Sequence, residues 1–348
     1  MRFESKGPES GEGVGFKPAI SIVMPLYNKE REVESAIQSV LAQTFHDYEL
    51  IVVNDGSTDR GPEIVYDIKD HRIRIVHKPN GGVSAARNRG IEEASSDLIA
   101  LFDADDEWMP DFLEIINRLR TRFSSCSVFA TNYLYRNVDG SLMPTIIRGL
   151  PSREWEGIIK NYFEIASRSD PPIWSSAVAI RKEAIRSVGG FPIGVKAGED
   201  LLTWAKFACK YEIAYSTRPS AIFYLRESLW GRPTRPPDSV DVVGQELEGI
   251  LKNEGKGKIS GLEEYIAHWH QMRASVYVRL GKRKEAMFEV KKIAKFSKKN
   301  SRTYLFLAIA LLPKKISAWA LRAVRYMKNR QRTKISPEDL ATVAKSKS

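Results

Sequence analysis

The chain has 348 residues, enough for one large domain and a smaller second part. Its 43% hydrophobic and 28% charged residues are typical of a folded globular protein and exclude a disordered one. The net charge of +11 is unevenly placed, because residues 251–348 carry 24 Lys or Arg and only 7 Asp or Glu. This charge boundary predicts two functional parts, the second of which faces an anionic surface.

Three features bound the cellular setting. Residues 1–17 are rich in Gly, Ser and Glu and lack the apolar core of a signal peptide, so we expect a disordered lead-in. No apolar run of about 18 residues occurs, and the sequence therefore predicts no ordinary transmembrane helix. Cys126 and Cys209 lack metal-ligand spacing, which indicates free buried thiols in a reducing cytoplasm.

Apolar segments alternate with helical segments in the first hundred residues. The pattern predicts strands at 19–25, 49–53, 73–77 and 97–102, and helices at 30–42, 61–69 and 84–94. Strands that are apolar throughout are typical of a mostly parallel sheet covered by helices on both faces. The sequence therefore predicts an α/β fold.

A polar loop follows each of these strands. The four loops are Tyr27-Asn28, Asn54-Asp55-Gly56, Asn80-Gly81-Gly82 and Asp103-Ala104-Asp105. Because ligands of such sheets bind beyond the carboxyl ends of the strands, we expect the loops to converge on one rim. The oxygen-only ligands of the last loop suit a hard divalent cation, whereas an isolated Asp-x-Asp is more often a solvated turn.

The middle of the chain extends this pattern. It predicts a helix at 111–123, a strand at 127–135, a hairpin turn at 137–140 and a strand at 173–181. Gly198-Glu199-Asp200 precedes an amphipathic helix, so two carboxylates lie at a helix N-terminus, where the dipole favours their ionised forms. The ordinary alternative is an acidic N-cap pair.

The basic C-terminal part is predicted to be helical. Helices are expected at 262–280 and 284–297, joined at Gly281. His268 and His270 do not face one ligand on a helix, which favours an ordinary structural role. Residues 300–334 hold nine basic and no acidic residues, and this predicts a helix lying in an anionic membrane surface. The alternative is packing on the catalytic part, and no pattern indicates nucleic-acid binding.

Six segments in order resemble glycosyltransferase family 2. They are Ser21-Ile-Val-Met-Pro-Leu-Tyr-Asn28, Ile51-Val-Val-Asn-Asp-Gly-Ser-Thr-Asp59, Asn80-Gly-Gly-Val-Ser-Ala-Ala-Arg-Asn-Arg-Gly90, Phe102-Asp-Ala-Asp-Asp106, Val188-Gly-Gly-Phe191 and Gly198-Glu-Asp200. The resemblance covers about residues 18–228 and implies a GT-A fold there. We expect a linker or lid at 229–260, a basic helical membrane-associating region at 261–335, and a tail at 336–348.

The resemblance also implies residue roles. The nucleotide-sugar site would comprise Pro25, Tyr27, Asn28, Asp55, Gly81, Arg87 and Asp103. Asp103 and Asp105 would hold Mn²⁺ or Mg²⁺ beside the leaving diphosphate. Asp200 would be the general base, with Trp174 and Glu199 beside the acceptor. A single base without a protein nucleophile implies inversion at the anomeric carbon.

Ordinary alternatives exist for several of these residues. Pro25 terminates a strand, Asp55 suits an Asx turn, Arg87 suits a solvent-facing charge, and Trp174 suits the core. Many family members also carry a histidine that completes the metal shell, whereas residues 223–229 here hold none. Diphosphate oxygens, water or Arg226 would have to take its place.

The sequence thus predicts an inverting glycosyltransferase that uses a nucleoside diphosphate-sugar, most simply a UDP-sugar. Its acceptor would be a glycan or a lipid-linked molecule in cell-surface polysaccharide synthesis. The predicted location is cytoplasmic, peripheral at the inner face of the plasma membrane. The rivals are a sugar nucleotidyltransferase and a non-catalytic nucleotide-sugar-binding or membrane-scaffold protein.

Overall fold

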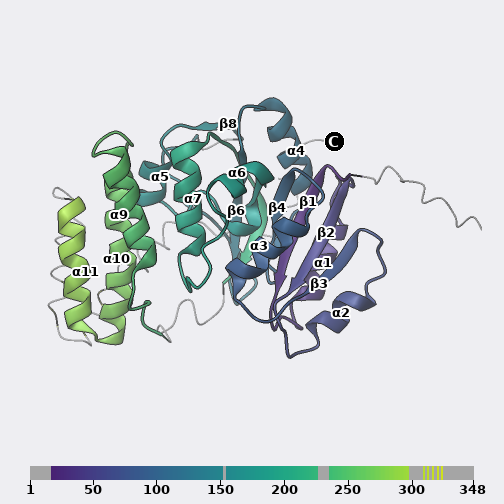
Figure 1. Ribbon diagram of the computed structural model, residues 1–348, viewed down its shortest axis with the longest axis horizontal. Coiled ribbons are helices and arrows are strands. Elements are labelled where there is room, and N and C mark those ends of the chain that lie inside the picture. The colour runs from purple at the N-terminus through teal and green to yellow at the C-terminus, as the bar shows by residue number, and fades with distance from the viewer. Residues whose placement is uncertain are drawn as a thin grey trace, which may run out of the picture.

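The computed structural model describes residues 17–151, 154–225 and 235–297, together with five single positions between 309 and 323. Figure 1 shows an α/β lobe built around one sheet, with the helices α9, α10 and α11 beside it. The lead-in 1–16 and Arg226 lie outside the described residues.

One mixed sheet forms the centre of the α/β lobe. Its strands are β1 (Ile20–Leu26), β2 (Tyr48–Asn54), β3 (Ile73–His77), β4 (Leu98–Leu101), β5 (Glu107–Trp108), β6 (Val128–Arg136), β7 (Leu142–Pro144), β8 (Glu156–Ile159), β9 (Val178–Arg181) and β10 (Ile213–Tyr224). The order is β3-β2-β1-β4-β9-β6-β10-β5, with β7 on β6 and β8 on β10. The β1, β2, β3 and β4 pairings are parallel, as are those of β6 with β10.

Helices cover the sheet and form the second lobe (Figure 1). They are α1 (Val33–Leu41), α2 (Gly61–Asp67), α3 (Val83–Glu93), α4 (Phe112–Arg122), α5 (Tyr162–Arg168), α6 (Lys182–Ser187), α7 (Glu199–Lys210), α9 (Val242–Glu254), α10 (Leu262–Leu280) and α11 (Arg283–Phe296). The branched residues of β1 and β2 are almost fully buried, because helices lie on both faces of these strands.

The first four predicted strands are confirmed to within about one residue, and the mostly parallel sheet is confirmed with them. The hairpin at 137–140 is also confirmed, since β6 and β7 pair as antiparallel strands. The predicted strand at 173–181 is too long. Residues Ser175–Ala177 form a 3-10 turn, and only Val178–Arg181 pairs, antiparallel to both β4 and β6.

The second lobe shares its core with the first. A single cluster of buried side chains runs from Val23 and Ile51 in the sheet through α5 and α7 to Val290 and Ile293 in α11. The domain boundaries stay a prediction. The segment 229–260, expected to be a linker or lid, contains the helix α9.

Most of the predicted membrane-binding segment 300–334 lies outside the described residues. Of its described positions, Ile309 is buried in the shared core and Ala320 packs against it, whereas Ile316 is exposed. Among the helices of the described part, none has the length and apolarity needed to cross a bilayer.

Candidate active site

The polar loops after the parallel strands meet at one edge of the sheet. We call residues 27–29, 54–59, 78–82 and 103–106 the strand-end rim. Direct contacts join its loops: Asn28 Oδ1 accepts from the Thr58 amide at 2.8 Å, and Lys29 Nζ lies 2.6 Å from Asp105 Oδ2. The predicted convergence is therefore present in the structure, as expected for carboxyl ends of parallel strands.

Asp55 organises the glycine loop. Its carboxylate is buried, accepts from the amides of Gly81 and Gly82 at 2.9 and 2.8 Å, and pairs with Lys78. The Asx-turn alternative is wrong for Asp55, because Asn54 is the side chain that accepts from the Ser57 amide. Gly82 has φ +84°, and a Cβ there would meet nothing within 4 Å, so the loop backbone is open to a ligand.

The end of β1 offers a wall for a planar ligand. Pro25 is the penultimate residue of β1 and pairs with Val53. Tyr27 follows the strand with 48% of its surface exposed, and Asn28 has a positive φ of 52°. An aromatic side chain left half exposed at a ligand edge is available for stacking.

Arg87 connects the rim to the start of α7. It is only 3% exposed, and its Nη2 donates to Asp103 Oδ1 at 2.7 Å, while Nη1 lies 3.5 Å from Glu199 Oε1. Its guanidinium also lies over the Phe191 ring. Burial lowers the pKa of Arg87, but the charges of Asp103 and Glu199 outweigh this and raise it. The solvent-facing alternative for Arg87 is therefore wrong.

The carboxylates of Asp103 and Asp105 each contact one cation, Arg87 and Lys29 respectively, and their side chains remain about a quarter exposed. These are oxygen donors on one short loop, with a third carboxylate from Asp106 beside them. Such a donor set fits a hard divalent cation.

Asp106 and Trp174 connect the loop that carries Asp103 and Asp105 to the segment before β9. Asp106 is buried, and its Oδ2 accepts from Ser176 Oγ at 2.5 Å and from Trp174 Nε1 at 3.2 Å. Burial, followed by the charges of Asp103 and Asp105, raises the pKa of Asp106 well above its usual value. Trp174 is half-buried and packs on Phe223 with 4.4 Å between ring centroids. The ring packs against the core as part of an aromatic cluster, and its contact with an acceptor stays a prediction.

Glu199 and Asp200 occupy the first turn of α7. Burial, followed by the charge of Asp200, raises the pKa of Glu199 to about 7. Burial also raises the pKa of Asp200, against the lowering effect of Arg87 and of the Leu201 amide, which donates to Oδ1 at 2.7 Å. Because the two carboxyl groups are adjacent, their raised pKa values belong to the pair.

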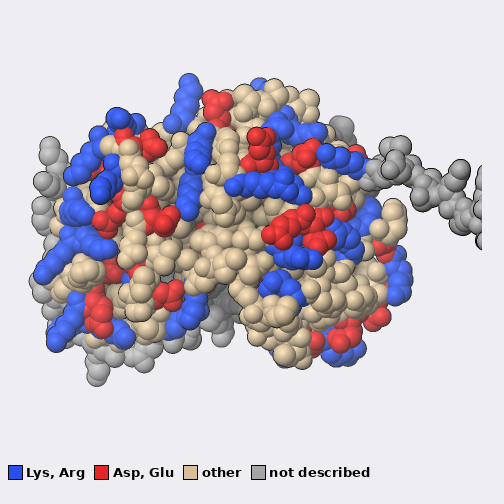
Figure 2. Space-filling view, in the orientation of Figure 1, with Lys and Arg blue, Asp and Glu red and all other residues tan. Residues whose placement is uncertain are grey.

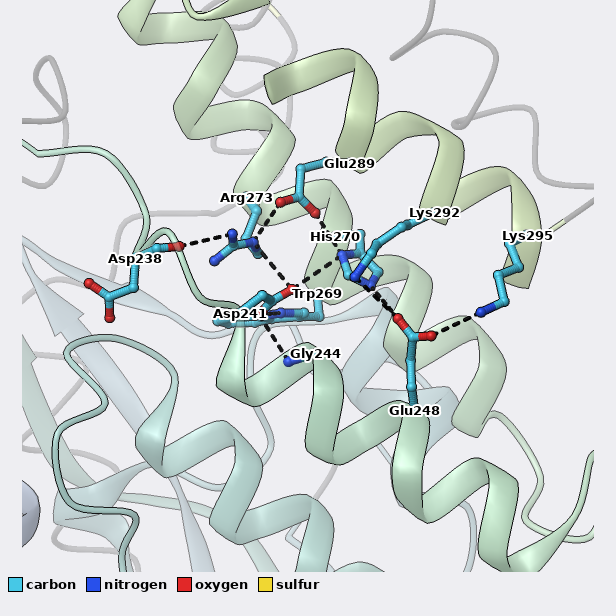
Figure 3. A network of polar contacts seen from close by, with 10 residues as sticks. All are labelled: Asp238, Asp241, Gly244, Glu248, Trp269, His270, Arg273, Glu289, Lys292 and Lys295. Atoms are coloured by element: carbon cyan, nitrogen blue, oxygen red, sulfur yellow. Dashed lines mark hydrogen bonds and ion pairs between the residues drawn. The ribbon is translucent and has the colours of Figure 1, made fainter. Parts of the chain in front are cut away.

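Sequence reasoning missed the basic partners of the rim. Lys29 and Lys78 pair with Asp105 and Asp55, and no motif distinguishes them from ordinary surface lysines. The structural role inferred for His270 agrees with its surroundings in the second lobe (Figure 3), where it contacts Glu289 and Asp241. Those three side chains resemble a metal-ligand set. A cation does not fit there, because Arg273 Nε already lies 2.8 Å from Glu289 and 3.4 Å from Asp241.

Comparison with known proteins points to one family. The family model described as Glycosyl transferase family 2 matches residues 21–188. TuaG of Bacillus subtilis, a putative teichuronic acid biosynthesis glycosyltransferase, is 30% identical over 204 residues, which are 58% of this chain and 76% of TuaG. EpsH of the same species, a putative glycosyltransferase, is 34% identical over 151 residues, 42% of this chain and 43% of EpsH. The match thus spans less than half of the length of EpsH.

A solved structure shows the same fold. The structure of Staphylococcus aureus TarS 1–349 in complex with UDP-GlcNAc superposes with a TM-score of 0.58 and 18% identity. The match covers 89% of this chain and 91% of that one. The chain therefore has the GT-A fold, with a helical region following the α/β lobe.

Proposed function

The chain belongs to glycosyltransferase family 2, and we propose on that premise that it transfers a sugar from a nucleoside diphosphate-sugar to an acceptor hydroxyl, with inversion. The observation that carries the proposal is the position of Arg87 between Asp103 and Glu199. One buried cation thereby links the carboxylates of the rim to those of α7. A donor and an acceptor bound at these two groups would lie next to each other.

On the donor side, the chain supplies a shaped and charged slot. Tyr27 and Pro25 would form the wall for the base, and the Asp55-ordered loop of Gly81 and Gly82 would approach the ligand closely. Lys29 and Arg87 lie at the carboxylates and would stabilise charge on a leaving diphosphate. Asp103 and Asp105 would hold Mg²⁺ or Mn²⁺, which supplies Lewis-acid stabilisation of that leaving group.

On the acceptor side, Asp200 would remove the hydroxyl proton as the oxygen attacks the anomeric carbon. With a pKa of about 7, Glu199 is partly protonated at neutral pH, and in that form it can donate a hydrogen bond to the acceptor. Attack by the acceptor oxygen on the face opposite the diphosphate produces inversion. Trp174 would border the acceptor, since its indole is held against Asp106.

Two similar proteins support a proposal for the substrate class. TarS is solved with UDP-GlcNAc, and TuaG is named for teichuronic acid biosynthesis. We therefore propose a UDP-sugar as donor and a cell-surface polysaccharide precursor, on a glycan or a lipid, as acceptor. The basic segment 300–334 supports attachment to the cytoplasmic face of the membrane.

The test is a panel of nucleotide-sugars assayed for nucleotide release with Mg²⁺ or Mn²⁺. We expect one donor to be turned over, and Asp200→Asn to lower the rate by about 10²–10⁴-fold. The matched control is Asp67→Asn on the exposed side of α2, which should keep the wild-type rate. Wild-type turnover by Asp200→Asn would exclude the proposed base, and release of pyrophosphate from a nucleoside triphosphate would favour the nucleotidyltransferase.

A further inference from the structure

A cavity lies beside the first turn of α7, and the chemistry proposed above makes no use of it. It has a volume of about 730 Å³, within the range of roughly 300–1,000 Å³ that is typical of ligand sites. Its walls come from residues 194–201, from residues 235–243 and from α10. Figure 2 shows that the middle of this face of the molecule, between the charged surfaces of the two lobes, carries few charged side chains.

The cavity is predominantly apolar. Val243, Met272 and Val276 contribute aliphatic walls, and Pro236 and Pro237 line it from the segment before α9. One of its exposed lining residues is also aliphatic, since Val240 is 60% exposed. Ile193, next to the lining residue Gly194, is also exposed. Exposed aliphatic side chains gathered at an apolar cavity are typical of a binding surface rather than of ordinary protein surface.

The cavity shares a wall with the proposed base. Trp269 lines it and packs against Gly198, where a Cβ would lie 2.5 Å from Trp269 Cζ3. The indole is fixed, because its Nε1 donates to Asp241 Oδ1 at 3.0 Å. Leu201 lines the cavity directly after Asp200. A ligand in the cavity therefore lies against the segment that carries both carboxylates of the acceptor side.

Basic groups lie at the same cavity. Lys196 and Arg235 are exposed lining residues, and Arg235 Nη2 donates to the Lys196 carbonyl at 2.8 Å, which holds the two segments together. Asp238 is the acidic lining residue near them, and its carboxylate accepts from the Lys196 amide. The lining therefore holds three basic side chains and two carboxylates beside apolar walls, Lys196, Arg235 and Arg273 against Asp238 and Asp241. This excess of positive charge beside an apolar cavity suits an amphipathic anion.

We propose that this cavity binds the hydrocarbon part of a lipid-linked acceptor, whose phosphate lies at Lys196 and Arg235. The inference rests on the proposed function for the identity of the ligand as the acceptor. It commits to a prenyl or alkyl chain that bears an anionic phosphate, because such a molecule combines the apolar volume and the charge that the cavity offers. The acceptor hydroxyl would then be delivered to the carboxylates of α7 from the side of the second lobe.

The primary test measures binding of farnesyl phosphate, below its micellar concentration, to the full chain by calorimetry. We expect saturable binding, and Val276→Trp, which fills the cavity, should weaken it at least tenfold, as if about two methylene groups were excluded. Val240→Asp should weaken binding similarly. Its matched control is Val138→Asp, which changes an equally exposed valine at the tip of the β6–β7 hairpin and should leave binding unchanged.

A second experiment distinguishes binding of the hydrocarbon part of the ligand from binding of its phosphate. Lys196→Ala should weaken farnesyl phosphate binding several-fold and leave farnesol binding unchanged. Equal affinity in wild type and Val276→Trp, complete competition by inorganic phosphate, or no saturable binding would each overturn the proposal. The binding assay contains no sugar donor, so these outcomes do not depend on the proposed function. Conversely, if no nucleotide-sugar is turned over while farnesyl phosphate binds as expected, the proposed function fails and the lipid site stands.

Discussion

The carboxylates of the strand-end rim and those at the start of α7 are held in opposite ways. Asp55, Asp103 and Asp105 each contact a lysine or arginine side chain. Glu199 and Asp200 are adjacent, share the influence of one arginine, and have raised pKa values. Each carboxylate of the first group lies beside a cation, whereas burial raises the pKa values of Glu199 and Asp200. This difference suits a charged leaving group on one side and proton transfer on the other.

The largest expected effect comes from removing the cation common to both groups. Arg87→Met leaves Asp103 and Glu199 without their shared buried partner, and it should lower the free energy of unfolding by about 3–5 kcal/mol. The matched control is Arg89→Met, also in α3, because Arg89 is half exposed and pairs with Glu93 on the same helix. It should cost about 0.5 kcal/mol or less in a urea titration. Equal costs for the two variants would contradict the central role given to Arg87.

Removal of divalent ions should affect the function of the strand-end rim and not that of the α7 carboxylates. Chelation of divalent ions is expected to reduce nucleotide release by at least about 100-fold, because the leaving diphosphate would lose the Lewis acid proposed above. Asp105→Asn should raise the Mn²⁺ concentration needed for half-maximal release, whereas Glu199→Gln should not move it. A rate that is indifferent to chelator would instead assign leaving-group stabilisation to Lys29 and Arg87.

The carboxyl group of Glu199 in α7 should make the free energy of unfolding depend on pH. The pKa of Glu199 is about 7 in the folded chain against an ordinary value of 4.5 for an exposed glutamate, so the folded state binds the proton more tightly. Its stabilising contribution is complete below pH 4.5 and is lost as the pH rises to 7. Relative to Glu199→Gln, wild type should lose about 3 kcal/mol over this interval. Urea titrations at several pH values test this, with Glu63→Gln as the exposed control, and a flat difference would contradict it.

The smallest effect concerns the contact between α7 and the second lobe. Gly198 and Gly194 have the same φ of +83°, but only at Gly198 would a Cβ meet Trp269. Gly194→Ala should cost about 1–2 kcal/mol from backbone conformation alone. Gly198→Ala should cost about 1–3 kcal/mol more, because the indole must shift. Equal melting temperatures for the two variants would mean that Trp269 does not hold the base-bearing segment.

Much of the α/β lobe was accessible from the sequence. Apolar runs such as Ile22–Pro25 and Ile51–Val53 are typical of strands buried on both faces, and their alternation with helices predicts a parallel sheet. The polar loops after these strands had to meet at one rim for the same topological reason. Family resemblance added Asp200, whose placement at the N-terminus of α7 is local and therefore readable.

Only the tertiary structure decided which charged side chains pair with one another. Arg87 in α3 meets Glu199 across more than a hundred residues, and the pairings of Lys29 with Asp105 and Lys78 with Asp55 join separate loops. Such contacts depend on the packing of elements rather than on local periodicity, so no spacing in the sequence predicts them. The cavity behind Gly198 arises likewise, because α10, α9 and the loop before α7 come together only when the shared core forms.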